Sequence, residues 1–257
     1  MPTPSALPEI SVVVPLRDEV GCIGPVIAEI HAALGDGCPF EIVAVDDGSM
    51  DGTADALARL AARHPALRVL RHPRGAGKSA AIHNGVLAAR AELVLTMDGD
   101  GQNPAEDLPR LVAAMEMGGR VGLVAGQRTC RRTTPLRRLA SRAANTLRAR
   151  MLGDGTRDAA CGMKAFHREA FLALPYFDSM HRFLPALFRA AGWQVRLVGV
   201  GDRPRLAGRS KYTNLGRAAT GAADLLGVLW LLRRRKKALA VEVLPAAPRL
   251  RAAEPAE

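Results

Sequence analysis

Short apolar runs alternate with helix-like segments through the first half of the chain. The runs lie at residues 10–14, 41–45, 67–70, 93–97 and 121–125. Amphipathic, helix-like patterns follow most of them, including one that begins near Pro25 and one near Pro104. Strands that are apolar on both faces and alternate with helices are typical of an α/β fold, so we expect a mostly parallel sheet with helices on both faces.

The second half is less regular, and its patterns predict further elements. Helices are expected over residues 135–152 and from residue 181, strands near 166 and at 194–200, and a basic loop at 203–212. Residues 218–232 are apolar but interrupted by Asp224, and five basic residues follow them. This stretch is shorter than the roughly 20 residues that span a membrane. It predicts an amphipathic helix that lies in the membrane interface.

These patterns predict four parts of the chain. A Pro-rich N-terminus, 1–9, and an Ala/Pro/Glu-rich tail, 238–257, are expected to be disordered. Between them we expect a catalytic domain over 10–215 and a polybasic membrane-surface helix over 216–237. The N-terminus has neither the basic nor the apolar region of a signal peptide.

The amino-acid composition limits which kinds of molecule the protein is expected to bind. The net charge of +11 over 257 residues requires an anionic partner, such as a membrane surface or a phosphorylated substrate. Aromatic residues make up only 4%, which disfavours stacking on single-stranded nucleic acid. The four cysteines are scattered without a CxxC pair, so free thiols in a reducing cytoplasm are expected rather than zinc ligands or disulfides.

Acidic residues end two of the predicted strands. Asp98 and Asp100 follow the run at 93–97, and Asp46 and Asp47 follow the run at 41–45. The carboxyl ends of parallel strands share the ligand-binding edge of a sheet, so these acids are expected to converge. Carboxylate oxygens are the ligands that Mg²⁺ and Mn²⁺ prefer. The simpler alternative for each pair is a polar turn that closes a strand.

A glycine-rich loop at residues 74–79, Arg-Gly-Ala-Gly-Lys-Ser, suggests two other functions. A P-loop would need another glycine where His72 stands, so an ATPase is disfavoured. The loop also fits the GxGxxA pattern from Gly75, with Asp98 about twenty residues further on, which is the spacing of a dinucleotide-binding dehydrogenase. The loop does not follow the first strand, however, and this alternative leaves the second acidic strand end unexplained.

A richer set of motifs resembles family 2 glycosyltransferases of GT-A fold. The motifs are Val-Val-Val-Pro ending at Pro15, Asp-Asp-Gly-Ser-Met-Asp-Gly-Thr at 46–53, Gly-Lys at 77–78, Asn-Gly at 84–85 and Asp-Gly-Asp-Gly-Gln-Asn-Pro at 98–104. Residues 124–128, 158–166 and 205–212, together with Ser141, resemble the dolichyl-phosphate mannosyltransferase branch. That branch includes bacterial polyprenyl-phosphate hexosyltransferases. The resemblance covers about residues 10 to 215.

The resemblance implies a donor site and a metal site. It assigns nucleotide contacts to Asp46 and to four further positions: Pro15, Asp47, Gly48 and Lys78. It assigns Mg²⁺ or Mn²⁺ to Asp98, Asp100 and Gln102, where the cation would bridge the diphosphate of a sugar nucleotide. Many relatives carry alanine and leucine at the two positions that are Gly99 and Gly101 here.

The resemblance also implies a site for the phosphate of a lipid acceptor. Arg128 and Ser141 match positions near that phosphate, and Asp158 matches an acid that orients acceptor or sugar. Arg205, Ser210 and Lys211 match a mobile basic loop that closes over the phosphates. The implied catalytic set is therefore Asp100, Arg128, Asp158, Arg205 and Lys211. Most other arginines of the acid-free stretch 126–153 more simply contact anionic lipid.

The function so implied is inverting transfer of a hexose from GDP-mannose or a UDP-hexose to a polyprenyl or dolichyl monophosphate. The protein is expected to be cytoplasmic and peripheral on the inner membrane face, held there by 216–237 or by a membrane-protein partner. Another copy of the chain is a further expected partner. Nucleic acid is not an expected partner. Transfer to a saccharide or other hydroxyl is the alternative, and it would need a general base such as Asp158 or Asp178. A non-enzymatic basic protein that binds membranes or nucleic acid is a more remote alternative.

Overall fold

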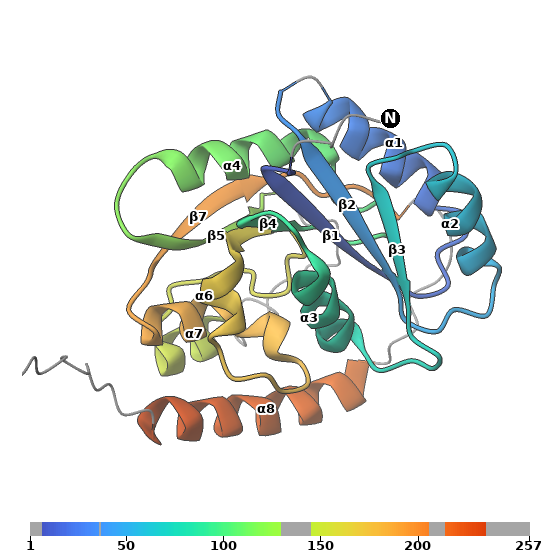
Figure 1. Ribbon diagram of the computed structural model, residues 1–257. Coiled ribbons are helices and arrows are strands. Elements are labelled where there is room, and N and C mark those ends of the chain that lie inside the picture. The colour runs from blue at the N-terminus through green and yellow to red at the C-terminus, as the bar shows by residue number, and fades with distance from the viewer. Residues whose placement is uncertain (1–6, 36, 130–144, 206–213, 235–257) are drawn as a thin grey trace, which may run out of the picture.

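Seven strands form one sheet at the centre of the protein (Figure 1). The computed structural model describes residues 7–35, 37–129, 145–205 and 214–234, and only the backbone of 214–220. The strand order is β3-β2-β1-β4-β6-β5-β7. The strands are β1 (Ile10–Leu16), β2 (Phe40–Asp46), β3 (Leu67–Arg71), β4 (Leu93–Thr96), β5 (Val121–Arg128), β6 (Lys164–His167) and β7 (Gln194–Val200).

Helices cover both faces of the sheet, as the alternation of strands and helices predicts (Figure 1). One face carries α1 (Ile23–Leu34), α2 (Thr53–Ala61), a 3₁₀ turn (Ala105–Asp107) and α4 (Leu108–Glu116). The other carries α3 (Lys78–Ala88), α6 (Arg168–Leu172), a 3₁₀ turn (Met180–Arg182), α7 (Leu184–Ala190) and α8 (Asn214–Arg234). Residues 145–152 are also helical, and the rest of the helix predicted from 135 lies outside the described residues.

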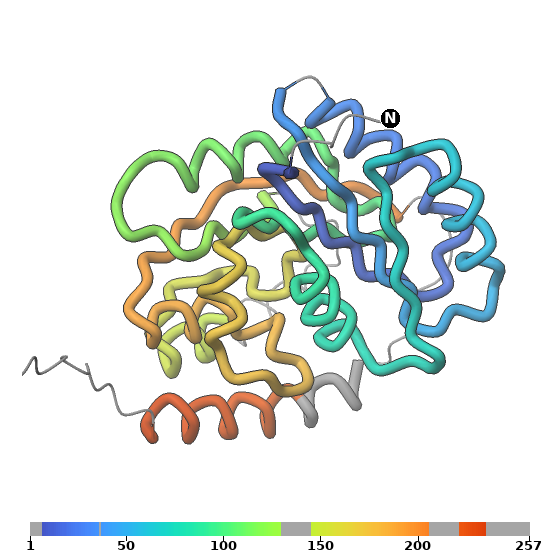
Figure 2. The backbone as a smooth tube through the Cα atoms, in the orientation of Figure 1, coloured from blue at the N-terminus to red at the C-terminus, as the bar shows by residue number. Residues whose placement is uncertain are grey.

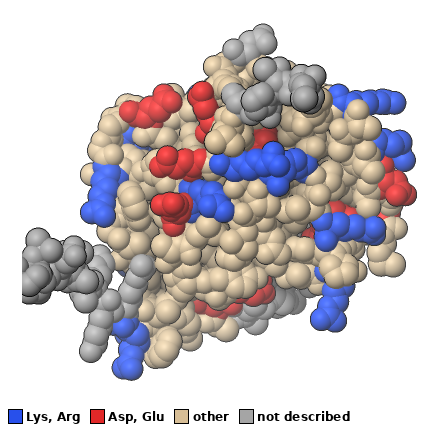
Figure 3. All heavy atoms as spheres, viewed as in Figure 1, with Lys and Arg blue, Asp and Glu red and all other residues tan. Residues whose placement is uncertain are grey.

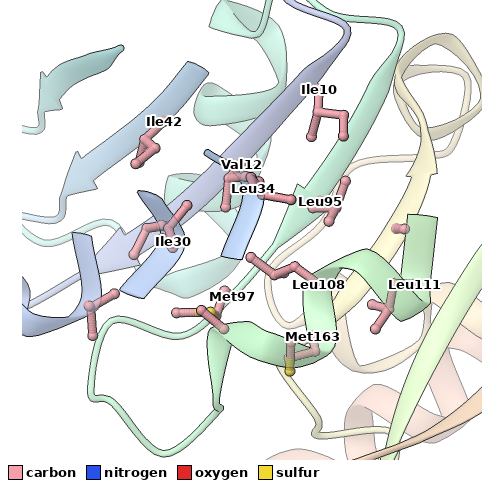
Figure 4. Close-up of a cluster of buried hydrophobic side chains, with 14 of the residues drawn as sticks. Ile10, Val12, Ile30, Leu34, Ile42, Leu95, Met97, Leu108, Leu111 and Met163 are labelled. Carbon is pink, nitrogen blue, oxygen red and sulfur yellow. The ribbon is translucent and has the colours of Figure 1, made fainter. Parts of the chain in front are cut away.

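Alternate residues of the central strands enter opposite layers of the core. Val12 and Val14 pack with α1 and α4, whereas Val13 packs with α3. Figure 4 shows the first layer, where Val12 and Leu95 of the sheet meet Ile30, Leu34 and other apolar side chains of the covering helices. Since both faces of these strands are buried, their sequences are continuously apolar.

One strand of the described sheet, β6, runs antiparallel to its neighbours. Lys164 at its start pairs with Thr96 at the end of β4 and with Ala125 of β5. The sheet is therefore mostly parallel, as predicted. The reversed strand has a consequence for the site, because the loop that precedes β6 reaches the edge where the parallel strands end.

Helix α8 lies along the layer that carries α3, α6 and α7 (Figure 2). Val228 faces the core and is 2% exposed, whereas Leu226 and Trp230 on the other face are each 64% exposed. Among the described residues, no helix is long and apolar enough to cross a membrane. The outer face of α8 is therefore apolar rather than polar, and Arg233 and Arg234 lie at its end.

Candidate functional site

Two carboxylates lie at the carboxyl edge of the sheet, directly after β4. Asp98 Oδ1 accepts a hydrogen bond from Lys78 Nζ at 2.5 Å. Asp100 Oδ2 accepts one from Arg205 Nη2 at 2.9 Å, and its Oδ1 accepts one from the amide of Gln102 at 3.1 Å. Each carboxylate is thus paired with a long cationic side chain that comes from another part of the chain.

The charges around these two acids shift their pKa values in opposite directions. Burial by itself would raise the pKa of Asp98, but the positive charges of Lys78, Lys164 and Arg128 together lower it. Burial and the negative charge of Asp98 raise the pKa of Asp100. The mutual repulsion of the two carboxylates favours a cation that both of them contact.

Glycines allow the close packing around the acidic pair. A Cβ on Gly162 would lie 2.2 Å from Asp98 Oδ1, and a Cβ on Gly99 would lie 2.0 Å from Leu16 Cδ2. Gly101 has a φ of +73°, which favours glycine over other residues. Glycine is therefore favoured at 99 by the close approach of Leu16 and at 101 by the backbone conformation, although many relatives carry alanine and leucine at these two positions.

The other acidic pair follows β2 and is held by the protein backbone. Asp47 Oδ1 accepts hydrogen bonds from Ala76 N at 2.7 Å and His72 Nδ1 at 2.8 Å, and its Oδ2 accepts one from Gly77 N at 2.9 Å. Asp46 is fully buried, and its Oδ1 accepts the amide of Ser49. Its Oδ2 lies 3.4 Å from Arg71 Nε without a hydrogen bond.

The glycine-rich loop before α3 therefore binds a carboxylate of the protein itself. Its amides at 76 and 77 point at Asp47, and a Cβ on Gly48 would lie 2.7 Å from the amide of Gly75. A P-loop or a dinucleotide fingerprint needs such amides for the phosphates of a ligand. This geometry disfavours both alternatives.

Arg128 and Asp158 form a two-pronged ion pair beside the acidic centre. Arg128 donates from Nε to Asp158 Oδ2 at 2.5 Å and from Nη2 to Oδ1 at 2.9 Å. Arg128 Nη1 lies 3.8 Å from Asp202 Oδ1. Burial disfavours the charge of Arg128, but Asp158 outweighs it and raises the pKa of the guanidinium. Arg128 is therefore a fixed, fully charged group.

Two residues of the site, Lys164 and His181, were assigned no role from the sequence. Lys164 is 4% exposed, and its ammonium donates to the carbonyl of Cys161. Burial lowers the pKa of Lys164, and Asp98 is among the charges that oppose this. His181 Nδ1 lies 2.7 Å from Ser79 Oγ. Burial and the nearby Lys78 hold the pKa of His181 well below its usual value. Lys164 stands at the start of β6 and within the stretch 158–166 quoted above, although that motif assigned it no role.

Glu19 is a further unexpected member of the site. Its Oε1 accepts a hydrogen bond from Arg205 Nη1 at 2.7 Å, so Arg205 bridges Glu19 and Asp100. Burial raises the pKa of Glu19, which the positive charge of Arg205 opposes. In the sequence, Glu19 lies in a polar loop after the first strand and belongs to none of the motifs noted above.

The acidic centre fits Mg²⁺ or Mn²⁺. Asp98 and Asp100 supply carboxylate oxygens, and Gln102 can add an amide oxygen. No cluster of three His, Cys, Asp or Glu side chains that could hold a metal occurs among the described residues. A cation here would thus take its remaining ligands from substrate or water, as Mg²⁺ commonly does.

The structure brings together most of the residues predicted from the sequence. Asp98, Asp100, Lys78 and Arg205 lie in direct contact, with the Arg128–Asp158 pair nearby. Gln102 adjoins Asp100. Pro15 is half-buried, and its carbonyl lies 3.4 Å from where a Cβ on Gly99 would be. Three predicted residues lie outside the described part of the chain: Ser141, Ser210 and Lys211.

Comparison with protein families identifies the family to which the chain belongs. The model of the family described as "Glycosyl transferase family 2" matches residues 11–174. The chain belongs to glycosyl transferase family 2. The matched region includes both acidic strand ends, Arg128 and the Asp158 loop.

Curated relatives of this family 2 protein share about a third of its residues. Dodecaprenyl-phosphate galacturonate synthase from Rhizobium johnstonii is 32% identical over 235 residues, which cover 89% of this chain and 69% of that protein. Undecaprenyl-phosphate 4-deoxy-4-formamido-L-arabinose transferase from Edwardsiella ictaluri is 34% identical over 206 residues, covering 79% of this chain and 62% of that protein. The chain thus spans about two thirds of the length of these relatives.

Solved structures confirm the predicted GT-A fold of this family 2 protein. Glucosyl-3-phosphoglycerate synthase from Mycobacterium tuberculosis, in complex with Mn²⁺, UDP-glucose and glycerol 3-phosphate, matches with a TM-score of 0.65 at 22% identity, over 88% of this chain and 80% of that one. Mannosyl-3-phosphoglycerate synthase from Rubrobacter xylanophilus has the same TM-score at 21% identity, over 93% and 79%. At these identities the comparison shows a shared fold.

Proposed function

We propose that this family 2 protein transfers a sugar from a nucleotide sugar to a polyprenyl monophosphate, with inversion at the anomeric carbon. The observation that carries the proposal is the pairing of Asp98 and Asp100 with Lys78 and Arg205 at the carboxyl edge of the sheet. Such a centre suits a diphosphate held through a divalent cation. The curated relatives that match most of the chain are named for transfer to polyprenyl phosphates.

In this proposal Asp98 and Asp100 would hold Mg²⁺ or Mn²⁺, which would supply positive charge to offset the negative charge of the leaving diphosphate. Lys78 and Arg205 add positive charge beside it, so the site favours departure of an anion. The nucleoside is placed at the end of β2, near the buried Asp46. The donor contacts of Pro15, Asp47 and Gly48 stay predictions from the family motifs.

The acceptor phosphate needs positioning more than activation. A phosphate monoester is anionic at neutral pH, so its oxygen can attack the anomeric carbon without a strong base. Bringing it beside a second phosphate requires fixed positive charge, which Arg128 supplies. In this proposal Asp158 acts as the group that fixes the plane of the Arg128 guanidinium. Ser141, Ser210 and Lys211 are the predicted additional contacts.

Transfer to a hydroxyl acceptor is less well supported by the same geometry. A hydroxyl would need a free general base, and Asp158 already accepts two hydrogen bonds from Arg128. The other candidate, Asp178, accepts the amide of Ser179 through Oδ1.

A nucleic-acid-binding function also finds little support. On the face shown in Figure 3, described basic side chains are separated by acidic and uncharged ones and form no continuous stripe. Nucleic-acid-binding domains usually gather Lys and Arg into one electrostatic footprint.

The reaction is tested by mixing the protein, Mg²⁺ or Mn²⁺, a polyprenyl phosphate and a panel of sugar nucleotides. The panel includes GDP-mannose, UDP-hexoses and UDP-hexuronates, because the relatives carry different sugars. We expect a metal-dependent glycolipid from one donor. Product from saccharide acceptors but from no polyprenyl phosphate would support the hydroxyl alternative, and the absence of any product would contradict the proposal.

We further propose that α8 holds the protein on the inner face of the cell membrane. Its outward face presents Leu226 and Trp230, and Arg233 and Arg234 follow at the end of the helix. Apolar side chains enter the acyl boundary, and arginines attract anionic headgroups. A membrane-protein partner or a second copy of the chain would replace this contact if α8 did not bind lipid.

The proposed membrane contact predicts a loss of vesicle binding when the outer face becomes charged. Leu226→Asp and Trp230→Asp together should reduce binding to anionic vesicles at least about tenfold, since apolar burial of two large side chains is lost. Met117→Asp is the matched control, because Met117 is 75% exposed and follows α4 on the opposite layer. Equal binding by both variants in a flotation assay would place the membrane contact elsewhere.

A further inference from the structure

Arg205 holds two carboxylates at once, and only one of them belongs to the acidic centre. Its Nη2 donates to Asp100 Oδ2 at 2.9 Å, and its Nη1 donates to Glu19 Oε1 at 2.7 Å. The side chains of Asp100 and Glu19 are each 12% exposed, whereas that of Arg205 is 26% exposed. The guanidinium is thus the most accessible member of a buried trio.

We infer that Arg205 changes its hydrogen-bond partner when substrate binds. In the metal-free protein it binds Asp100, and in the protein with metal and donor bound it binds the donor diphosphate. Throughout this exchange it stays bound to Glu19, which serves as its pivot. This inference rests on the proposed function, because it needs a diphosphate at the acidic centre. Glu19 lies outside the motifs quoted above for the family resemblance.

The exchange follows because two cations, Arg205 and a divalent metal ion, would compete for one carboxylate oxygen of Asp100. Asp100 Oδ2 cannot accept the Arg205 N–H and also lie against a divalent cation without placing two positive charges side by side. Arg205 therefore leaves Asp100 when a divalent cation takes that carboxylate. A guanidinium has five N–H donors, so it can keep Glu19 through Nη1 and turn Nη2 towards a phosphate oxygen.

Glu19 makes this movement a rotation about a fixed point rather than a release into solvent. It lies just after β1, and its own amide is held by Thr53 Oγ1 at 2.9 Å. A guanidinium that stays anchored by one N–H loses less conformational freedom on reaching the phosphate than a free one would. Glu19 is accordingly a positioning residue that acts through Arg205.

Arg203, two residues before Arg205, contacts the same region of the protein but neither of the two carboxylates of the acidic centre. It donates to the carbonyl of Gly101 at 2.5 Å and to Glu29 at 2.5 Å. It contacts the loop of the acidic centre but neither of its carboxylates, so its removal takes away one positive charge without freeing Asp100. Arg203 therefore offers a matched control.

The exchange predicts opposite effects of one substitution on two binding reactions. Arg205→Gln should strengthen binding of Mn²⁺ alone by about tenfold, because Asp100 loses its competing cation. The same variant should weaken binding of UDP or GDP at saturating Mn²⁺ by about tenfold, because a phosphate loses its partner. Mn²⁺ binding is followed by electron paramagnetic resonance of the nucleotide-free protein, and nucleotide binding by calorimetry.

Two further variants sharpen the test. Arg203→Gln should change each affinity less than about threefold, as expected for a charge that contacts neither carboxylate of the acidic centre. Glu19→Gln should weaken nucleotide binding at saturating Mn²⁺ by about threefold, and this loss should disappear in the Arg205→Gln background. A residue that merely supported the fold would not show that dependence.

The outcomes separate this inference from the function on which it rests. If Arg205→Gln leaves Mn²⁺ affinity unchanged or lowers it, or behaves like Arg203→Gln, the exchange is wrong while the transferase function stands. If Glu19→Gln strengthens nucleotide binding, Glu19 is not the pivot. If the unaltered protein binds neither Mn²⁺ nor any nucleoside diphosphate, the proposed function itself fails.

Discussion

The two acidic strand ends look alike in the sequence but differ in what holds them. After β2, Asp46 and Asp47 are 0% and 4% exposed, and backbone amides occupy most of their oxygens. After β4, the side chain of Asp98 is 26% exposed, and Asp98 and Asp100 are held mainly by the side chains of Lys78 and Arg205. Backbone amides are fixed partners, whereas long cationic side chains can leave.

This difference shows which of the acids keep oxygens for a metal ion. A carboxylate saturated by the backbone stabilises a loop, as Asp47 does for the loop before α3. A carboxylate paired with a movable cation keeps oxygens that a metal can take. In the structure, the acids after β2 therefore hold a loop in place, whereas those after β4 keep oxygens that a proposed cation could take.

The largest expected effect is on turnover at the β4 end. Asp100→Asn should reduce glycolipid formation by about a thousandfold or more, because it removes a charged ligand of the proposed cation. Its unfolding temperature should stay near that of the unaltered protein. Rates within tenfold of normal, measured with saturating donor and metal, would contradict the assignment of the metal centre.

At the β2 end the expected effect is on stability instead. Asp47→Ala should lower the free energy of unfolding by about 3 kcal/mol, because it leaves two loop amides without their partner. Denaturant titration measures this, with the exposed Asp55→Ala as the control expected to change stability by about 0.5 kcal/mol or less. If Asp47→Ala abolished turnover without loss of stability, the two ends would be equivalent and the comparison would fail.

A smaller effect is expected where the Asp98 carboxylate packs against backbone. Gly162→Ala would put a Cβ 2.2 Å from Asp98 Oδ1, so the carboxylate must move. We expect turnover to fall by about tenfold to a hundredfold, since displacements of this kind misplace a ligand by about 1 Å. Gly227→Ala, which meets nothing within 4 Å, should leave turnover unchanged. Equal rates for the two variants would mean that the position of Asp98 is not critical.

The smallest predicted effect concerns pH. The pKa of His181 is well below 6.5 in the folded protein, so its imidazole stays neutral there while the unfolded chain takes up a proton below about pH 6.5. Its contribution to stability is complete above that pH and is lost as the pH falls further. His181→Gln should therefore reduce the loss of stability between pH 7.5 and pH 5.5 by about 1 kcal/mol. Parallel pH profiles for the two proteins would exclude this role.

The sequence predicted the fold well because its strands carry a strong signal. Buried strands such as 10–14 and 41–45 are continuously apolar, and acids mark where two of them end. The antiparallel β6 was not foreseen, since strand direction is set by pairing with distant residues such as Thr96. Helix α8 was predicted to be amphipathic, whereas the structure shows apolar side chains on both sides, with Val228 in the core and Leu226 and Trp230 facing outwards.

The candidate site was predicted in part for the same physical reason. Residues with a local motif, such as Asp98, Asp100 and Arg128, could be named from the sequence. Glu19 could not, because its contact with Arg205 spans more than a hundred residues of the chain. Lys164 lies in the stretch 158–166, but its burial beside the acidic centre was not visible in that motif. The hydrogen bonds that hold Asp47 could not be predicted from the sequence either, since the amides that donate them lie about thirty residues away in the chain.

The most direct test of the central claim is the binding of UDP and GDP, with and without Mn²⁺, to the unaltered protein and to Asp100→Asn. If Asp98 and Asp100 hold a diphosphate through a cation, Mn²⁺ should strengthen binding of one nucleotide to the unaltered protein by tenfold or more, and by less than about twofold to the variant. Binding that is independent of Mn²⁺ in both proteins, or equally strengthened by Mn²⁺ in both, would contradict that claim.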